Sequence, residues 1–261
     1  MPEGDTVWRT ARRLHRALAG QTLTRTDFRV PRYAALDLAG ETVHSVVARG
    51  KHLLHRVGAD TTVHTHLRME GAWHLYRPAS RWRRPAYQAR VVLHTEPWVA
   101  VGFDLGAVDV VAREEESSLV GHLGPDLLGP DWDADEALRR LRAEPDRQVG
   151  EALLDQRNLA GLGNLYKSEV CFLTGVHPFR AVGQVDDLAR LVARAQRLLE
   201  ANKDRAEQTT TGDTRRGRRT WVYLRAGEPC RRCGTRIATA HQGATGEERQ
   251  TFWCPRCQPG A

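Results

Sequence analysis

The sequence predicts an α+β protein with several parts, an antiparallel β-sandwich led by a helix, a helical segment and a small four-cysteine finger. Three observations predict this arrangement: short β-rich runs over residues 22–112, helical periodicity after about residue 134, and two Cys-x2-Cys pairs near the end. The chain has 261 residues with 41% hydrophobic content, enough for one large or two ordinary domains plus the finger. No apolar run is long enough to cross a membrane.

The first expected element is an amphipathic helix over residues 5–19. Val7, Leu14 and Leu18 fall on one face of this helix, and Gly20 follows as its stop. It is the only helix signal before residue 130. From residue 22 to about residue 112, short β-rich runs broken by Gly, Pro and Asp predict an antiparallel sandwich or barrel. These runs cover residues 42–50, 52–57, 62–67, 89–95 and 98–103.

The second half of the sequence reads as helical. The stretch over residues 121–133 is rich in Gly and Pro and predicts a linker. Helices are expected over residues 135–143, 147–157, 165–174 and 186–202. We therefore expect domains over residues 1–120, 131–214 and 215–261.

Four of the five cysteines predict one structural zinc site. Cys230 and Cys233 form one Cys-x2-Cys pair, Cys254 and Cys257 form another, and twenty residues separate the pairs. Two such pairs bring four thiolates into a tetrahedron, and a segment of about thirty residues needs such a metal to fold. Disulfide pairing is the alternative, but the opening MPEGDTVWRT has no signal-peptide core, so we expect a reducing, cytoplasmic location rather than secretion. Cys171, among apolar neighbours, is expected to be a small buried hydrophobe.

The net charge is concentrated at one end of the chain. Residues 215–261 contain ten arginines, three glutamates and no lysine, so the whole net charge of +7 falls there. A basic finger favours a polyanion as partner, with nucleic acid ahead of a membrane because no lipid-facing apolar stripe accompanies it. A solvated basic tail is the alternative.

Residues 158–169, NLAGLGNLYKSE, predict a tight reversal between two helices. The Gly161-x-Gly163 pair does not fit a dinucleotide fingerprint, because a helix precedes it and no third glycine follows. Asn164 is expected to cap the second helix at its N-terminus. A helix start also binds anions, so the spacing leaves a structural cap and a phosphate contact open.

Several of these residues together resemble one protein family. Pro2-Glu3-Gly4 at the start, Lys51 in RGKHLL, Asn164 in AGLGNLY, and the stretch from Arg249 to Cys257 resemble the formamidopyrimidine-DNA glycosylase and endonuclease VIII family in order along the chain. The resemblance implies a β-sandwich begun by a helix, a helix–two-turn–helix domain and a zinc finger. It also implies a base-excision repair glycosylase and AP lyase that acts on damaged double-stranded DNA, as a monomer associated with the nucleoid and without an added small-molecule cofactor.

The chemistry that the resemblance implies can be derived from the first two residues of the motif. If Met1 is removed, Pro2 becomes a secondary amine with a pKa of about 8, low enough to leave some neutral nucleophile at neutral pH. Its attack on the sugar C1′ expels the damaged base, and the resulting iminium promotes elimination of the 3′ and then the 5′ phosphate. Glu3, beside the nucleophile, can protonate the opening sugar. An ordinary helix-leading Pro-Glu is the alternative.

The resemblance assigns four further residues. Lys51 matches a lysine that contacts the phosphate and assists elimination, although a plain surface lysine is the alternative. Arg249 matches a finger arginine that grips phosphates and is linked to the second elimination, and Asn164 matches a phosphate contact. Met69, in HLRMEG, resembles a wedge that fills the space left by an extruded base, and a buried strand methionine is the alternative.

Two departures from the family pattern bear on the substrate. The Arg-Arg-Phe-Gly string of the 8-oxoguanine branch is absent from residues 99–108, VAVGFDLGAV, which points to the endonuclease VIII branch and to oxidised pyrimidines. Thr6 stands where many members have a glutamate, and Asp5 is next to it. The alternatives are an 8-oxoguanine-type glycosylase, a non-catalytic DNA-binding zinc-finger protein and an RNA-binding helix–two-turn–helix protein. The two non-enzymes leave Pro2-Glu3 together with Lys51 unexplained.

Overall fold

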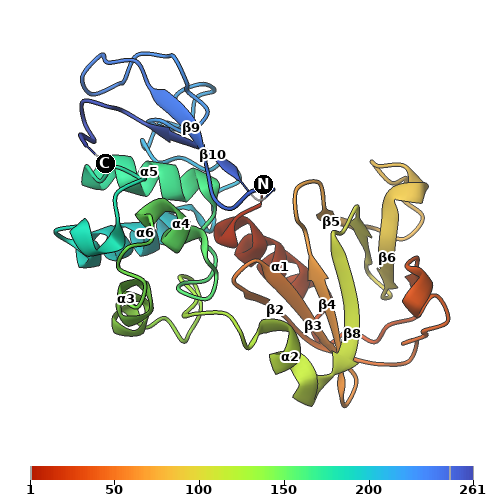
Figure 1. The fold of residues 1–261 in the computed structure, drawn as a ribbon. Helices are drawn as coiled ribbons and strands as arrows, with labels where there is room; N and C mark the ends of the chain where they lie inside the picture. Colours follow the sequence, from red (N-terminus) through yellow and green to blue (C-terminus); the bar gives the residue numbers. More distant parts are fainter. Residues whose placement is uncertain (1, 247, 261) are drawn as a thin grey trace. The chain divides into compact units, whose positions relative to one another are not determined.

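The computed structural model describes residues 2–246 and 248–260, and the chain forms two compact units, Met1–His122 and Leu123–Ala261 (Figure 1). Each unit is described by itself. Among the described residues, no helix is long and apolar enough to span a membrane.

The first unit begins with helix α1 (Gly4–Leu18), as predicted, and continues into two antiparallel sheets of four strands (Figure 1). One sheet has the order β1-β6-β7-β5 and the other β2-β3-β4-β8, so the predicted sandwich is confirmed. The strands are β1 (Arg25–Phe28), β2 (Val43–Arg49), β3 (His52–Val57), β4 (Thr61–His66), β5 (Ala72–Tyr76), β6 (Ala89–His94), β7 (Val99–Phe103) and β8 (Ala107–Ala112). Short 3-10 turns cover Pro31–Tyr33, Ala86–Gln88 and Arg113–Glu115.

Alternation along the strands explains why these sheets enclose a core. Along β3, Leu53 and Val57 are four positions apart, so they share a face of the sheet, and both are fully buried in the core of the sandwich. Helix α1 packs against β2 and adds Leu14 and Leu18 to the same core. The helix therefore serves as one wall of the sandwich, and its first residues are held by that packing.

A second helix in this unit, α2 (Glu116–Val120), contradicts the expectation of only one helix before residue 130. Glu116 at its start accepts hydrogen bonds from Arg56 at 2.8 and 2.9 Å and from the Thr62 hydroxyl at 2.6 Å. Both partners lie on strands more than fifty residues earlier. Such tertiary anchoring of a five-residue helix leaves no local periodic signal.

The second unit consists of four helices followed by a β-hairpin (Figure 1). These elements are α3 (Ala134–Arg142), α4 (Val149–Leu154), α5 (Asn164–Thr174), α6 (Leu188–Asn202), a 3-10 turn (Val182–Gln184), β9 (Ala238–Gln242) and β10 (Arg249–Trp253). The helix expected over residues 147–157 is shorter than predicted. It ends at Leu154 because Asp155 is extended and its carboxylate binds the backbone N–H and guanidinium of Arg157.

The segment predicted as a linker is largely built into the second unit. Residues 123–127 are buried, and the Leu127 N–H donates to the Ala160 carbonyl oxygen at 3.2 Å. Gly124 packs so closely that a Cβ there would lie 2.6 Å from the carbonyl oxygens of Arg157 and Asn158. Glycine in this stretch therefore serves close backbone packing rather than flexibility.

Candidate functional site

The N-terminal residues of the first unit place a buried carboxyl group beside the candidate nucleophile. Glu3 occupies the N-cap position of α1 and is 2% exposed, yet its side chain makes no capping hydrogen bond. Pro2 is half-buried, and Met1, whose removal would free its amine, lies outside the described residues. Glu3 is therefore a buried carboxyl group at a helix start that it does not cap.

Asp5, the neighbour of the Thr6 position where many family members have a glutamate, is also buried. Asp5 is 1% exposed, and its Oδ1 accepts the backbone N–H of Thr6 at 2.8 Å. The Thr6 hydroxyl lies 3.5 Å from the same oxygen. A second acid is thus buried two residues after Glu3, although it is held by its own helix turn.

Lys51 lies in a two-residue turn between β2 and β3. Arg49 and His52 pair across this turn, and Gly50 adopts a φ of 57°, a left-handed value that favours glycine at the first turn position. Lys51 itself is half-buried. Burial, followed by the charge of Lys51, lowers the pKa of His66 to about 4. The hairpin thus sets the lysine directly before β3, close to histidines of the same sheet.

Met69 is exposed on a loop, so the reading as a buried strand methionine is wrong. The loop joins β4 to β5, and the Met69 side chain is 61% exposed. The loop is tightly built, because a Cβ on Gly71 would lie 2.4 Å from the Leu67 carbonyl oxygen. Arg68, with a φ of 49°, is one of the non-glycine residues in the left-handed region. An exposed apolar side chain on a well-packed loop has the form that a wedge requires.

In the second unit, Asn164 connects α5 to the hairpin instead of capping the helix. Gly163 is the N-cap residue, so the predicted cap is wrong. The Asn164 Nδ2 donates to the Gln250 carbonyl oxygen at 2.8 Å, and its buried Oδ1 has no hydrogen-bond partner among the described residues. Gln250 follows Arg249 directly, so this hydrogen bond fixes Asn164 next to the strand that carries Arg249, the other candidate phosphate contact of this unit.

Arg249 is exposed at the start of β10, where it pairs with Gln242 of β9. It lines a surface pocket of about 520 Å³ together with Arg147, Arg157 and Gln242. Arg147 and Arg157 share the Asp155 carboxylate, and Arg147 also pairs with Glu144, so both arginines already have acidic partners. The Arg249 guanidinium makes no ion pair with a described residue, so its charge is available to an anion.

The four predicted cysteines meet in space. Their Sγ atoms all lie within 4.8 Å of one another, with 3.9 Å between Cys230 and Cys257 and 3.5 Å between Cys233 and Cys254. Tetrahedral zinc with Zn–S bonds of about 2.3 Å places its sulfur atoms about 3.8 Å apart. The donor set therefore fits one structural zinc ion.

Helix α5 holds the finger with two charged residues that the sequence did not reveal. Lys167 is fully buried and its Nζ donates to the Thr251 hydroxyl of β10 at 2.5 Å. Glu169 is also fully buried and accepts the backbone N–H groups of Trp221 and Val222, each at 2.8 Å. Burial raises the pKa of Glu169, and these donors oppose that rise. The signal in the sequence that could have revealed this role is the presence of Lys167 and Glu169 within a mostly apolar helix. Cys171, on the same helix, is fully buried as expected.

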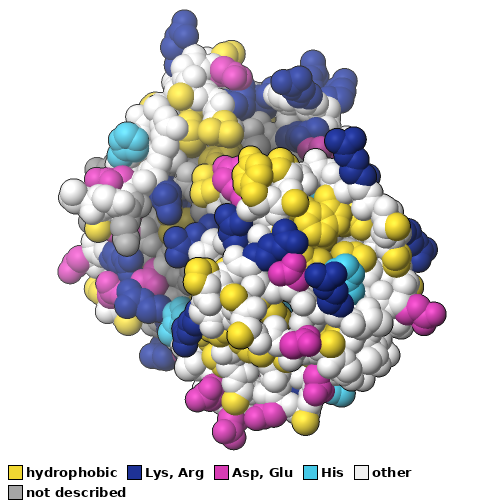
Figure 2. Space-filling model, turned by 90° about the vertical axis from the view of Figure 1, so that its right-hand side faces the viewer, with side chains coloured by type: hydrophobic (Ala, Val, Ile, Leu, Met, Phe, Trp, Pro, Cys, Tyr) yellow, Lys and Arg dark blue, Asp and Glu magenta, His cyan; other side chains and the backbone are white. Residues whose placement is uncertain are grey.

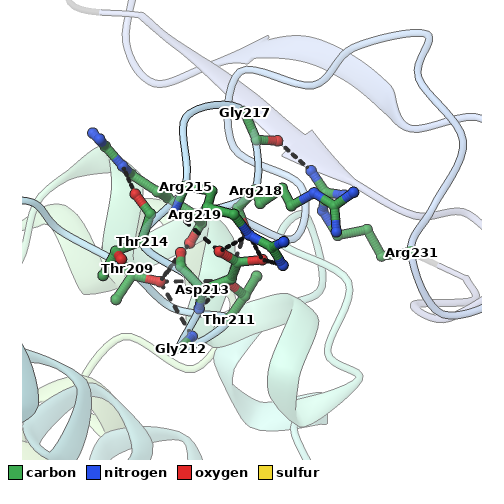
Figure 3. A network of polar contacts seen from close by, with 10 residues as sticks. All are labelled: Thr209, Thr211, Gly212, Asp213, Thr214, Arg215, Gly217, Arg218, Arg219 and Arg231. Carbon is green, nitrogen blue, oxygen red and sulfur yellow. Dashed lines mark hydrogen bonds and ion pairs between the residues drawn. The ribbon is translucent and has the colours of Figure 1, made fainter.

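A basic loop precedes the finger. This basic loop, residues 209–219, is drawn in Figure 3 with Arg231, whose guanidinium donates to the Gly217 carbonyl oxygen at 2.5 Å. The Asp213 carboxylate binds Arg215, and the Thr209 hydroxyl donates to the Asp213 carbonyl oxygen at 2.9 Å. Arg216 is exposed and makes no side-chain hydrogen bond to a described residue. The sequence assigned this charge to a basic finger, and the structure places part of it in this hydrogen-bonded loop before the cysteines.

Lysine and arginine side chains are spread over the face of the molecule drawn in Figure 2, together with hydrophobic and acidic side chains.

Three family models match the chain in succession. The formamidopyrimidine-DNA glycosylase N-terminal domain matches residues 1–110, and the helix–two-turn–helix domain of the same enzymes matches residues 123–213. The zinc finger found in FPG and IleRS matches residues 227–260.

Similar proteins span the whole chain. "Probable endonuclease 8 2" of Streptomyces coelicolor is 59% identical and covers 100% of this chain and 95% of its own. "DNA-(apurinic or apyrimidinic site) lyase Nei2" of Mycolicibacterium smegmatis is 51% identical and covers 99% of both chains. A crystal structure of Lactococcus lactis Fpg with DNA containing an oxidized pyrimidine has a TM-score of 0.82 at 25% identity, covering 99% of this chain and 100% of that one. The chain belongs to the formamidopyrimidine-DNA glycosylase and endonuclease VIII family.

Proposed function

We propose that this protein is a base-excision repair DNA glycosylase and AP lyase that uses Pro2 as its nucleophile. The observation that carries the proposal is the buried carboxyl group of Glu3, which is adjacent to Pro2 and does not cap its helix. Nucleophilic attack by the Pro2 amine on C1′ breaks the glycosidic bond, and Glu3 supplies the proton for the opening sugar. Lys51, fixed by its hairpin, then assists elimination of the 3′ phosphate.

The proposed substrates are oxidised pyrimidines in double-stranded DNA. The Arg-Arg-Phe-Gly string is absent from residues 99–108, and the similar proteins from Streptomyces and Mycolicibacterium carry endonuclease 8 and Nei2 names. The exposed Met69 suits the role of a wedge in the space left by the extruded base, because the target atom is shielded inside a duplex.

Asn164 and Arg249 are the proposed phosphate contacts of the second unit. Both belong to the connection between α5 and the finger, and Arg249 makes no competing ion pair with a described residue. Zinc supplies no chemistry to the reaction and only holds the hairpin that carries Arg249. We further propose that the protein acts on the nucleoid as a monomer and needs no small-molecule cofactor.

Borohydride trapping tests the proposed nucleophile. Incubation with duplex DNA containing an abasic site or thymine glycol should give a covalent protein–DNA adduct, because borohydride reduces the iminium to a stable amine. Pro2→Gly and Glu3→Gln should abolish base release from thymine glycol while largely sparing DNA binding.

Two surface substitutions serve as matched controls, Pro31→Gly and Glu41→Gln, because both residues are exposed and lie outside the proposed site. Both variants should trap like the wild type. Absence of an adduct from wild-type protein with Pro2 confirmed at its N-terminus by mass spectrometry, together with tight DNA binding, would instead identify a non-catalytic DNA-binding protein.

A further inference from the structure

A chain of hydrogen bonds runs across one face of the sheet β2-β3-β4-β8 and ends beside Lys51. The His64 Nδ1 lies 3.1 Å from the Asp109 Oδ2, and the His64 Nε2 lies 2.8 Å from the His52 Nδ1. Strand pairing explains the alignment, because His64 is opposite Asp109 across β4 and β8, and His52 is opposite His66 across β3 and β4. His64 in the middle of this chain is 4% exposed, whereas His52 is half-buried and the Asp109 side chain is 32% exposed.

The carboxylate at one end determines where the protons lie. An ionised Asp109 only accepts hydrogen bonds, so a neutral His64 must carry its proton on Nδ1 and leave Nε2 bare. The bare His64 Nε2 must then accept from His52, which places the proton of His52 on Nδ1. The other nitrogen of His52, Nε2, is left as a lone pair with no hydrogen bond to any described residue.

The surroundings of His52 keep its ring neutral. Its ring centroid lies 5.0 Å from those of His64 and His66 and 6.3 Å from that of His122. Burial, followed by these three rings and by the charge of Lys51, lowers the pKa of His52 to about 3. The group therefore presents an uncharged acceptor near a lysine at neutral pH.

A metal site is the other arrangement that clustered histidines adopt, and His66 opposes it. The His66 Nδ1 accepts the backbone N–H of Arg68 at 2.9 Å, so a neutral His66 carries its proton on Nε2 and that nitrogen cannot bind a metal. Among the described residues, the only group with metal-binding geometry is the four-cysteine site.

We propose that His52 is a positioning residue for Lys51, with its bare Nε2, set by His64 and Asp109, accepting a hydrogen bond from the Lys51 ammonium and directing it during elimination. Lys51 directly precedes His52 at the hairpin turn, and its charge is among those that lower the pKa of His52, so the two groups are near enough to interact. No net proton transfer is required, because the ammonium keeps its protons while it donates. This proposal rests on the proposed function, since Lys51 acts in the elimination step.

Asp109→Asn tests the proposal at a distance from Lys51. The side-chain amide that this substitution introduces can donate a hydrogen bond to His64 Nδ1, so the proton of His64 moves to its Nε2. His64 then donates to His52 Nδ1, and the proton of His52 moves to its Nε2. An N–H at His52 Nε2 cannot accept a hydrogen bond from the Lys51 ammonium. Long-range ¹H–¹⁵N NMR of histidine-labelled protein should show a bare His52 Nε2 in the wild type and a protonated one in Asp109→Asn. Single-turnover β-elimination on abasic DNA should slow about tenfold, the kinetic equivalent of one lost hydrogen bond, with DNA binding unchanged.

A double-mutant cycle with His52→Phe separates this role from a purely structural one. His52→Phe keeps an aromatic ring and removes the acceptor, so it should slow elimination by a similar factor, and adding Asp109→Asn should then have no further effect. His52→Gln should restore part of the rate, because its amide oxygen can accept. Glu116→Gln, which changes a carboxyl group on the same sheet face that binds Arg56 and Thr62, should leave the rate unchanged.

If Asp109→Asn slowed β-elimination by the same factor in the wild-type and the His52→Phe backgrounds, the proposal would be overturned. A protonated His52 Nε2 in the wild type would also overturn it. Two zinc ions per wild-type chain, with one lost in His52→Phe, would overturn it in favour of a metal site. Wild-type protein that fails to cut abasic DNA would refute the proposed function instead, and the NMR result would still report on the chain of hydrogen bonds.

Discussion

His55 should make the first unit sensitive to acid. Its ring is fully buried in the sandwich, 4.8 Å between centroids from Trp73, and neither ring nitrogen has a hydrogen-bond partner among the described residues. Burial, followed by the charge of His64, lowers the pKa of His55 to about 3, whereas the unfolded chain has a histidine pKa of about 6.5. Between these values the unfolded state binds a proton that the folded state rejects, so the free energy of unfolding falls as pH falls.

The size of the effect follows from the two pKa values. From pH 7.5 to pH 5.5, protonation of the unfolded state at this one position lowers the free energy of unfolding by about 1.4 kcal/mol. The contribution is fully present above the unfolded pKa and is lost progressively down to the folded pKa of about 3. His55→Leu has a similar volume, cannot titrate, and removes two buried polar atoms, so it should stay within about 1.5 kcal/mol of wild type at pH 7.5.

Urea unfolding at both pH values, followed by tryptophan fluorescence, measures this. The change in unfolding free energy between pH 7.5 and 5.5 should be smaller in His55→Leu than in wild type by about 1.4 kcal/mol. Subtracting the two proteins cancels the titration of all other groups, including the half-buried His52 and His66. Equal pH dependence in both proteins would refute the assignment of His55 as a buried neutral histidine.

Two further predictions concern the finger. Removing zinc with a chelator should abolish DNA binding while the near-UV signal of the first unit is retained, because the metal orders only the segment around its four cysteines; zinc-free protein that binds DNA with full affinity would contradict this. Arg249→Ala should weaken DNA binding and reduce the slope of log affinity against log salt by about one unit, because one phosphate contact is lost. The control is Arg139→Ala, because Arg139 is exposed on a helix and pairs with Glu136; this change should leave the salt slope unchanged. Equal slopes for wild type and Arg249→Ala would show that Arg249 does not contact a DNA phosphate.

The parts of the fold that were predictable carry local signals. The spacing of the cysteines and the periodicity of α1 depend on neighbouring residues alone, and both were predicted correctly. The start of α5 was not, because the Asn164 side chain donates to the Gln250 carbonyl oxygen on a hairpin 86 positions away instead of capping the helix. The hydrogen bond between His52 and His64 was also invisible, since only strand register places the two rings together.

Lys167 and Glu169 have a consequence for anyone who recombines relatives of this protein. Their buried charges are matched by Thr251 and by the backbone at Trp221 and Val222, so α5 and the finger are parts of one folding unit. A chimera joined within residues 203–220 would combine α5 of one relative with the finger of another, so the partners of both buried charges would come from a different protein. A junction next to residue 123 transfers α5 and the finger together. Residues 123–261 are therefore the segment that can be inherited or engineered as a single module.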